Sequence, residues 1–560
     1  MAAELITRVY NNFRGVDFRG EEINLTRSPD SLNVYKDYTE TESIRTRPDI
    51  ELLETFTDTV YGIFFYTVAG ITRMLVHSGT KLYSVLDGVK TEVCDGLNEM
   101  RSDAFIYNNV WYFKDGKNYL QYDGTTINQV EGYVPTTSIA RKPKSGGTIY
   151  EDINMLSDYR INTFLADGEG TQFYLDAEEI DTDFAPEVKV NDEVVTNYTV
   201  DYEKGWITFA TAPEKPLTDG QDNISVKFKK TVAGYKDKIN NCTLLQVFDN
   251  RVFFSGNKDF PNTIFHCSLN DPTYCSDLDY YSEGLDNAMV KGLVAGNNVL
   301  WVFKEPSQAN TTVFYHTPTI DSEYGKIYPS THSNVSTGCV GKAINFNDDI
   351  VFFSERGMEG INGDINTEQV VAHRSTLVDR KMIAEPSYKD MILEEWNGYL
   401  VVIIDDKVYL ADSRAMFQNE NHLEYEWFYW KLGKKITCTK VDNGVMYLGT
   451  EDGVYTLTDT EGNVESYWIT PIDKFKYPHK QKTTNKKGCV SEATGDVTVY
   501  AKTEKTEFEL IGEYKNVTDY FVSRIKKKKF KDIQLKFYSE TRFSLETVTL
   551  ECYVGAYIKR

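Results

Sequence analysis

Residues 248–255 read Phe-Asp-Asn-Arg-Val-Phe-Phe-Ser, a two-residue polar turn followed at once by a short apolar run. Six other places in the chain have the same design, a polar or glycine-containing pair in front of an apolar run. These pairs begin at Asp58, Asn108, Asn297, Asp348, Asn397 and Asn443, and the pair at Asp58 is the weakest copy. Because Asn, Asp and Gly tolerate the positive φ angles of tight hairpin turns, the repeated design predicts β-hairpins.

The spacing of these turns indicates the architecture. From residue 249 they recur at 297, 348, 397 and 443, in steps of 46 to 51 residues, and the step from 58 to 108 is 50. A period of about 40–50 residues with about four short strands in each repeat is typical of a β-propeller. Seven turns predict seven blades, with six to eight possible, and the segment before residue 58 is a candidate closing strand. A series of β-sandwiches with accidental spacing is the alternative.

The step from 108 to 249 is too long for one repeat and predicts an inserted domain. The excess follows the basic stretch that starts at Arg141, and its later strands alternate apolar and polar residues, as in residues 224–229. This pattern predicts a small β-sandwich over residues 146–233.

A second β-sandwich is predicted at the C-terminus, after a lysine-rich linker over residues 474–487. The expected division is an N-terminal arm with the first blades (1–145), the inserted sandwich (146–233), the remaining blades (234–473) and the C-terminal sandwich (474–560). Helical periodicity is nearly absent, so the fold class is all-β.

Charge is distributed unevenly over these parts. The chain of 560 residues has a net charge of −23, yet residues 471–560 contain 19 Lys and Arg against 12 Asp and Glu. Residues 148–230 contain 18 Asp and Glu against 7 Lys and Arg. Such asymmetry favours separate domains that face different neighbours, although a solvated acidic surface would explain part of it.

The sequence has no signal for membrane insertion, secretion or cofactor binding. The most apolar stretch, residues 61–71, is about half the length of a membrane-spanning helix, and the N-terminus lacks a signal-peptide pattern, so synthesis in a cytoplasm is expected. The eight cysteines form no CxxC pair, and Cys267 and Cys275, the only close pair, are expected to be free thiols. No phosphate-binding loop, nucleophile elbow or sialidase-type Asp-box is present, so we expect no cofactor, no metal and no enzyme.

Several acidic clusters are candidate sites. Glutamates stand beside tryptophans at Glu394, Glu395 and Trp396, and again at Glu424, Glu426, Trp427 and Trp430. A glycosidase needs two carboxylates, but strand edges within a blade are the preferred interpretation of both clusters. The pairs Asp348-Asp349 and Asp405-Asp406 would suit calcium, but hairpin turns explain them without a metal.

The sharpest charge feature is a basic run between two predicted strands of the C-terminal unit. It consists of Arg524, Lys526, Lys527, Lys528, Lys529 and Lys531. One hypothesis is contact with DNA phosphates or with an acidic neighbouring subunit. The other is a solvated edge strand that its lysines protect against self-pairing. The sequence favours neither.

Three N-terminal segments resemble the opening of phage tail nozzle and packaged-DNA stabilization proteins. They are Asn-Phe-Arg-Gly-Val-Asp-Phe at residues 12–18, Arg-Ser-Pro-Asp-Ser-Leu-Asn at residues 27–33 and Arg-Thr-Arg-Pro at residues 45–48. The family pattern continues with Gly where this chain has Asp49, which leaves the turn at that point in doubt. Residues 248–257, with the Asn-Asp-Pro-Thr-Tyr of residues 270–274, resemble blades of the same proteins, and the insertion resembles a β-module of phage tail and adhesion proteins.

This resemblance implies a structural protein of the bacteriophage virion. Several copies, a hexamer by expectation, would form a ring in the tail below the portal and adaptor, contacting these and other tail proteins. The ring would extend the channel for genomic double-stranded DNA, without sequence-specific binding, and retain packaged DNA until ejection. An acidic wall suits such a conduit because it repels phosphates.

Two alternatives remain open at this point. The first is a receptor-binding or adhesin protein of the tail that recognises host surface glycans. The second is a propeller glycosidase, although the resemblance offers no catalytic residues to transfer.

Overall fold

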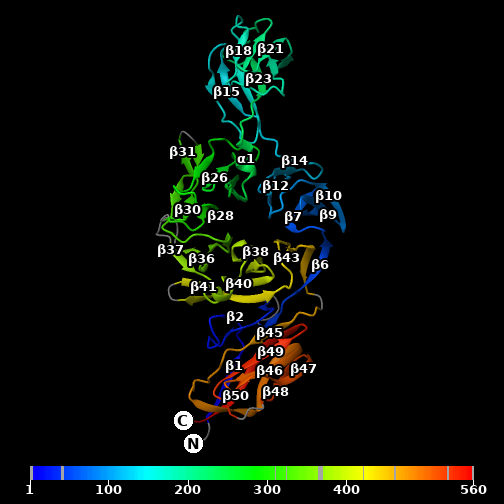
Figure 1. Ribbon diagram of the computed structural model, residues 1–560, viewed down its shortest axis with the longest axis vertical. Coiled ribbons are helices and arrows are strands. Elements are labelled where there is room, and N and C mark those ends of the chain that lie inside the picture. Colours follow the sequence, from blue (N-terminus) through cyan, green and yellow to red (C-terminus); the bar gives the residue numbers. More distant parts are fainter. Residues whose placement is uncertain are drawn as a thin grey trace.

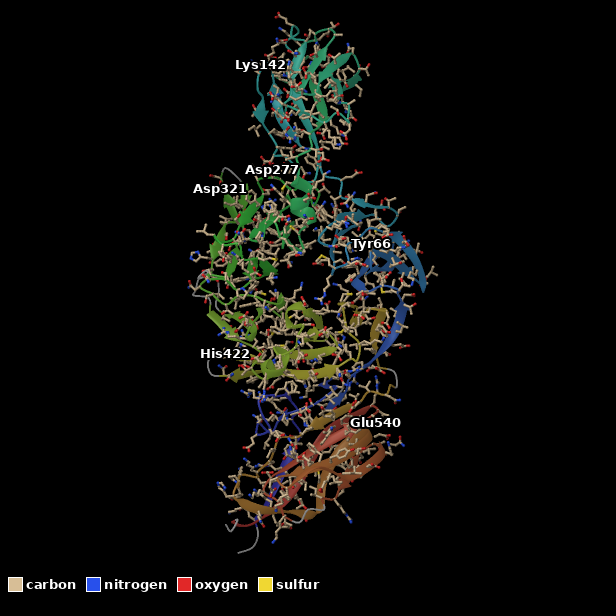
Figure 2. All side chains as sticks on the ribbon, in the orientation of Figure 1. Tyr66, Lys142, Asp277, Asp321, His422 and Glu540 are labelled. Carbon is tan, nitrogen blue, oxygen red and sulfur yellow. The ribbon has the colours of Figure 1, made fainter. Side chains whose placement is uncertain are left out.

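The computed structural model describes residues 4–38, 43–308, 311–322, 325–362, 370–419, 422–459, 462–525 and 529–557. Strands dominate these ranges, and the helices among them are the short α1 (Tyr235–Asn240) and α2 (Asp379–Met382) and one 3-10 turn, Tyr388–Asp390. The molecule is elongated, with the inserted domain at one end, a ring of blades in the middle and a C-terminal unit at the other end (Figure 1). Side chains fill all three parts, with Lys142 in the insert and Glu540 in the C-terminal unit (Figure 2).

Seven four-stranded antiparallel sheets of the described residues form blades 1 to 7, numbered along the chain. Blade 1 consists of β7 (Val60–Val68), β8 (Ile71–Ser78), β9 (Lys81–Leu86) and β10 (Val89–Cys94). Blade 2 consists of β11 (Asp103–Tyr107), β12 (Val110–Lys114), β13 (Tyr119–Tyr122) and β14 (Ile127–Gln129). Blade 3 consists of β24 (Leu244–Phe248), β25 (Arg251–Ser255), β26 (Thr263–His266) and β27 (Tyr280–Ser282). Blade 4 consists of β28 (Val290–Gly296), β29 (Val299–Lys304), β30 (Val313–His316) and β33 (Ser330–His332).

The ring continues in the same way through the last three blades. Blade 5 consists of β34 (Ala343–Phe346), β35 (Asp349–Ser354), β36 (Gly357–Asn362) and β37 (Val370–His373). Blade 6 consists of β38 (Ile392–Trp396), β39 (Tyr399–Ile404), β40 (Lys407–Asn419) and β41 (His422–Lys431). Blade 7 consists of β42 (Cys438–Asp442), β43 (Val445–Gly449), β44 (Gly453–Thr458) and, from the N-terminal arm, β6 (Asp49–Thr55).

The N-terminal strand β6 closes the ring. It pairs antiparallel with β44, from Asp49 opposite Thr458 to Thr55 opposite Gly453. The last blade is therefore completed by the first part of the chain, and the ends of the propeller are joined by backbone hydrogen bonds. The all-β class, the seven-bladed propeller and the closing strand are confirmed.

The hairpin turns follow the sequence pattern in six blades. In blades 2 to 7 the first two strands are joined by a two-residue turn in which both residues have positive φ, for example Asn108 (49°) and Asn109 (62°). In blade 5 the turn is Asn347-Asp348, one residue earlier than the expected Asp348-Asp349. The bulky side chains that follow these turns form the buried second strand of each blade.

Blade 1 differs from the expectation. Asp58-Thr59 is not a hairpin turn within a blade, because β6 before it pairs with blade 7 and β7 after it starts blade 1. The first hairpin of blade 1 turns instead at Ala69 (φ 50°) and Gly70 (φ 80°). The prediction of a hairpin turn at Asp58 is therefore wrong, although the predicted first blade is present.

The inserted domain consists of a six-stranded and a three-stranded sheet. The larger sheet contains β15 (Thr136–Arg141), β16 (Thr148–Ile149), β17 (Tyr159–Phe164), β19 (Glu187–Val190), β20 (Glu193–Val195) and β23 (Ile224–Lys229). The smaller contains β18 (Gln172–Tyr174), β21 (Tyr198–Asp201) and β22 (Trp206–Phe209). β15 precedes the expected boundary at residue 146 but belongs to this domain, because it pairs in parallel with β17.

The C-terminal unit is one nine-stranded sheet that includes strands from both ends of the chain. From the C-terminal side come β45 (Ser466–Ile469), β46 (Lys480–Thr503), β47 (Thr506–Val517), β48 (Tyr520–Ser523), β49 (Ile533–Ser539) and β50 (Phe543–Tyr557). The N-terminal arm adds β1 (Glu4–Tyr10), β4 (Val34–Lys36) and β5 (Ile44–Thr46). The unit thus starts before residue 474, and part of the expected linker 474–487 is strand, because β46 begins at Lys480 and pairs with β50.

One hydrophobic core spans the C-terminal unit and the adjoining blades. Phe13 and Tyr35 of the arm pack in the same cluster as Trp430 of blade 6 and Phe537 of β49. The inserted domain has a separate cluster of its own, which contains Phe164, Phe173 and Phe228. The C-terminal unit is therefore fused to the propeller by packing, whereas the insert is an appended module.

Candidate functional site

The basic run connects β48 to β49 on the surface of the C-terminal unit. Lys526, Lys527 and Lys528 lie outside the described residues. Arg524 and Lys529 are exposed, while Ile525 and Phe530 beside them are buried in the core. The described members of the run lie outside the strands, which does not support the edge-strand hypothesis.

The base of the run already has partners within the chain. The backbone N–H of Lys531 donates to Glu504 Oε2 at 2.9 Å, and Lys482 Nζ donates to the carbonyl oxygen of Lys531 at 2.5 Å. Burial, together with the Glu504 carboxylate, raises the pKa of Asp532. The C-terminal end of the run is therefore held within a surface of mixed charge.

The N-terminal segments that carry the family resemblance contact blade 6. This contact is here called the arm junction, and it consists of Gly15, Arg27, Asn33 and Arg47 with residues 426–431. Gly15 lies in β2 (Gly15–Val16), which pairs in parallel with β3 (Arg27–Ser28). Its φ is 120°, and a Cβ at this position would collide with the carbonyl oxygen of Trp427. Only glycine allows the arm to approach blade 6 this closely.

Arg27 anchors the same arm through a two-pronged ion pair. Its Nε and Nη2 donate to the two carboxylate oxygens of Glu426 at 2.8 and 2.7 Å, and its guanidinium lies 4.2 Å from the centre of the Phe417 ring. Burial raises the pKa of Glu426, and Arg27 opposes that shift. Glu426, one of the acidic residues noted beside tryptophans, is thus occupied by a structural ion pair.

Asn33 joins the arm to two other segments. Its Oδ1 accepts hydrogen bonds from the backbone N–H of Lys431 at 2.8 Å and from Arg47 Nε at 3.0 Å. Its Nδ2 donates to the carbonyl oxygen of Glu465 at 2.8 Å, just before β45. Arg47 also donates to the carbonyl oxygen of Lys431 at 3.1 Å. The residues that carried the family resemblance therefore act as buried connectors.

The doubt over Asp49 is resolved by the backbone. Asp49 is the first residue of β6, and it is not among the described residues with positive φ. A glycine is therefore not required at this position.

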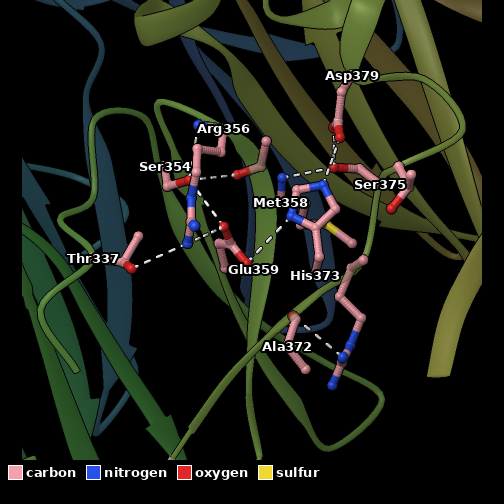
Figure 3. Close-up of polar contacts among 12 residues, drawn as sticks. Thr337, Ser354, Arg356, Met358, Glu359, Ala372, His373, Ser375 and Asp379 are labelled. Atoms are coloured by element: carbon pink, nitrogen blue, oxygen red, sulfur yellow. Dashed lines mark hydrogen bonds and ion pairs between the residues drawn. The ribbon is translucent and has the colours of Figure 1, made fainter. Parts of the chain in front are cut away.

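Blade 5 and its surroundings contain an ionised cluster that the sequence did not indicate (Figure 3). His373 Nε2 lies 2.5 Å from Asp379 Oδ2, and its Nδ1 lies 3.3 Å from Glu359 Oε2. Burial disfavours the charged ring, but hydrogen bonds to Asp379 and Glu359 outweigh it and raise the pKa of His373 to about 10. Arg356 adds a second cation, 3.1 Å from Glu359.

This cluster is the arrangement of two carboxylates most open to a catalytic interpretation, and its geometry argues against one. A glycosidase needs one carboxyl group that gives up a proton and another that is free to attack or to activate water. Here both Glu359 and Asp379 are bound to the charged His373, and Ser375 Oγ also donates to Asp379 Oδ1 at 2.6 Å. The cluster resembles a structural ion triad.

The other acidic candidates have structural partners too. Asp349 binds Arg374 at 2.8 Å and accepts a hydrogen bond from the Tyr425 hydroxyl at 2.8 Å. Glu424 is fully buried, and its Oε1 accepts from Thr376 Oγ1 at 2.7 Å. Asp405, with φ 55°, stands in the turn between β39 and β40.

The described ranges contain neither a metal-binding cluster nor a membrane-spanning helix. No group of three or more His, Cys, Asp or Glu side chains there is placed to hold a metal ion. No helix there is long and apolar enough to cross a membrane. The eight cysteines are free, and the Sγ atoms of Cys267 and Cys275 lie 2.6 Å apart in the core.

Comparison with known proteins gives structural likenesses alone. No protein-family model matches the chain, and no curated protein matches it. BamB from Moraxella catarrhalis aligns with a TM-score of 0.34 and 12% identity, over 73% of this chain and 96% of that one. A glycoside hydrolase aligns with a TM-score of 0.23 and 7% identity, over 88% of this chain and 98% of that one. An exo-beta-1,3-galactanase from Phanerochaete chrysosporium aligns with a TM-score of 0.23 and 10% identity, over 55% and 94% of the two chains.

Proposed function

We propose that this chain is a structural, non-enzymatic subunit of a bacteriophage tail. Copies of it, six by expectation, would form a ring that extends the DNA channel below the portal and adaptor and retains packaged DNA until ejection. The genomic duplex would pass without sequence-specific binding.

The observation that carries this proposal is the arm junction. The residues that resemble the nozzle and stabilization family, Gly15, Arg27, Asn33 and Arg47, are those that fix the arm between blade 6 and the C-terminal unit. A subunit that transmits load along a tail needs its parts joined rigidly, and a shared core with buried ion pairs supplies that rigidity.

The charge distribution supports assembly from copies. The C-terminal unit has an excess of basic residues while the chain as a whole has a net charge of −23. Neighbouring copies can therefore meet through complementary patches, which mainly favours correct register and fast association.

Negative-stain electron microscopy of the purified full-length chain tests the proposal. We expect closed rings of one size, whose formation slows as salt screens the charges. Particles that stay monomeric at high concentration and low salt would contradict it.

A receptor-binding protein is the second candidate, and the position of the insert favours it. The insert occupies the far end of the elongated molecule and has its own core, as a recognition head would (Figure 1). A glycan array probed with the isolated chain separates the candidates, because saturable binding to one glycan class would favour the second.

A further inference from the structure

The innermost strands of the seven blades line a cavity on the axis of the propeller, here called the hub cavity, which is partly open to solvent. Its volume is about 330 Å³, enough for on the order of ten water molecules. Every blade contributes to its wall: Tyr61 from blade 1, residues 101–103 at blade 2, 243–246 at blade 3, 291–293 at blade 4, 342–344 at blade 5, 391–393 at blade 6 and 438–439 at blade 7.

The charges of the wall are mainly positive. Arg101, Lys291 and Lys342 line the cavity, and Asp103 is the one acidic residue among the lining residues. The lining therefore has two more cations than anions, inside a molecule whose net charge is −23.

Among the described residues, only Lys291 of these three cations has a carboxylate within 4.0 Å. Arg101 donates to two carbonyl oxygens, of Thr437 at 2.8 Å and of Met391 at 3.1 Å, which fix its guanidinium at the wall. Lys291 approaches a carboxylate only at 4.0 Å, from Glu305. Among the described residues, the ammonium group of Lys342 takes part in no hydrogen bond and no ion pair within 4.0 Å.

These cations lie close enough to repel one another. Burial lowers the pKa of Lys342, and the positive charges of Arg101 and Lys291 lower it further, while Asp103 opposes the shift. Because water inside a narrow protein cavity screens charge less well than bulk solvent, an anion between these groups would relieve the repulsion.

We propose that the hub cavity binds a small multivalent oxyanion of the phosphate class, held by Lys342, Lys291 and Arg101. Each lysine offers three donors on a flexible stem, and the fixed guanidinium offers a planar donor edge. Asp103 limits the affinity by repulsion. This inference goes beyond the tail function and does not depend on it.

Isothermal titration of the full-length chain with inorganic phosphate at pH 7, at constant ionic strength, tests the proposal, with sulfate as a second oxyanion. We expect saturable binding of one ion per chain. Lys342→Gln should weaken it about tenfold, because one cation is lost from a poorly screened site. Asp103→Asn should tighten it by a similar factor, and its side-chain oxygen can still accept the hydrogen bond from the Ala104 N–H.

Lys435→Gln is the matched control, because the side chain of this lysine is 59% exposed and its one ion pair with a described residue is with the surface residue Glu451. The affinity of the Lys435→Gln variant for phosphate should equal that of the unmodified chain. If Lys342→Gln does not fold, the opposite shift expected for Asp103→Asn still decides. Absence of saturable binding, or equal affinities for Asp103→Asn and the unmodified chain, would overturn the proposal.

Discussion

Single residues join parts of this chain that lie hundreds of positions apart. Asn33 binds the backbone of Lys431 and of Glu465 as well as the guanidinium of Arg47, and it does so with a φ of 55°. Losing its side chain would leave partly buried backbone groups of Lys431 and Glu465 without this partner, which costs more than the hydrogen bonds themselves contribute.

We therefore expect Asn33→Ala to lower the free energy of unfolding by about 2–4 kcal/mol, measured by urea denaturation. Asn516→Ala is the control, because Asn516 also has a positive φ, of 50°, but is exposed. Its cost should be limited to backbone strain, about 1 kcal/mol. Equal losses in the two variants would show that the three side-chain contacts of Asn33 contribute nothing.

The ion triad of blade 5 predicts a pH dependence. The folded pKa of His373 is raised from 6.5 to about 10, so its contribution to stability is fully present below about pH 6.5 and is lost as pH rises toward 10. The stability difference between the unmodified chain and His373→Gln should thus shrink between pH 6.5 and 9. Thermal melting of both proteins across that pH range measures this difference. A constant difference would mean that the imidazole of His373 is neutral in the folded protein.

At the scale of elements, the sequence pattern located six hairpins because their turns need Asn, Asp or Gly. It missed Ala69-Gly70 in blade 1, where the first turn residue has no such preference. It also placed β15 outside the insert, since pairing between β15 and β17 is non-local and leaves no mark in either segment.

The candidate sites were less predictable than the fold. Glu359, His373 and Asp379 carry no joint spacing signal, and the hub cations lie on three different blades. Conversely, Glu426 stood out beside tryptophans, but its partner Arg27 is 399 positions away, so its structural role could not be deduced.

Close packing of β2 against blade 6 gives a sharp test of the arm. Gly15→Ala should displace the arm, because a Cβ there collides with the Trp427 backbone at an unfavourable φ. We expect a loss of about 3 kcal/mol or more and faster cleavage of the arm in limited proteolysis. Gly20→Ala is the control, because its Cβ would meet nothing within 4 Å. Identical proteolysis of both variants would contradict the described contact.

On the scale of the whole molecule, the inserted domain can be removed because the points where the chain enters and leaves it lie close together. The chain enters it twice, and each entry is bridged by a backbone hydrogen bond: Tyr150 N–H to Thr137 O at 3.2 Å, and Lys230 N–H to Asp158 O at 2.7 Å. Between the two excursions, Met155 and Leu156 pack with the core of blades 2 and 3 and must be kept.

Replacing residues 138–149 and 159–229 by two short Gly-Ser bridges should therefore leave a folded propeller. Circular dichroism and a single cooperative melting transition would verify this, and ring formation should persist if the insert is not an interface. A variant that lacks residues 146–233 is the comparison. It loses Met155 and Leu156, so its melting temperature should be lower than that of the double-bridge variant. Aggregation of the double-bridge variant at all temperatures would show that the insert supports the propeller.

The proposed function places this chain in the tail of a virus particle. Electron micrographs of virions labelled with an antibody against this chain test it most directly. We expect the label to be confined to a ring on the tail axis below the portal. Label at the tips of fibres, or particles without label, would contradict it.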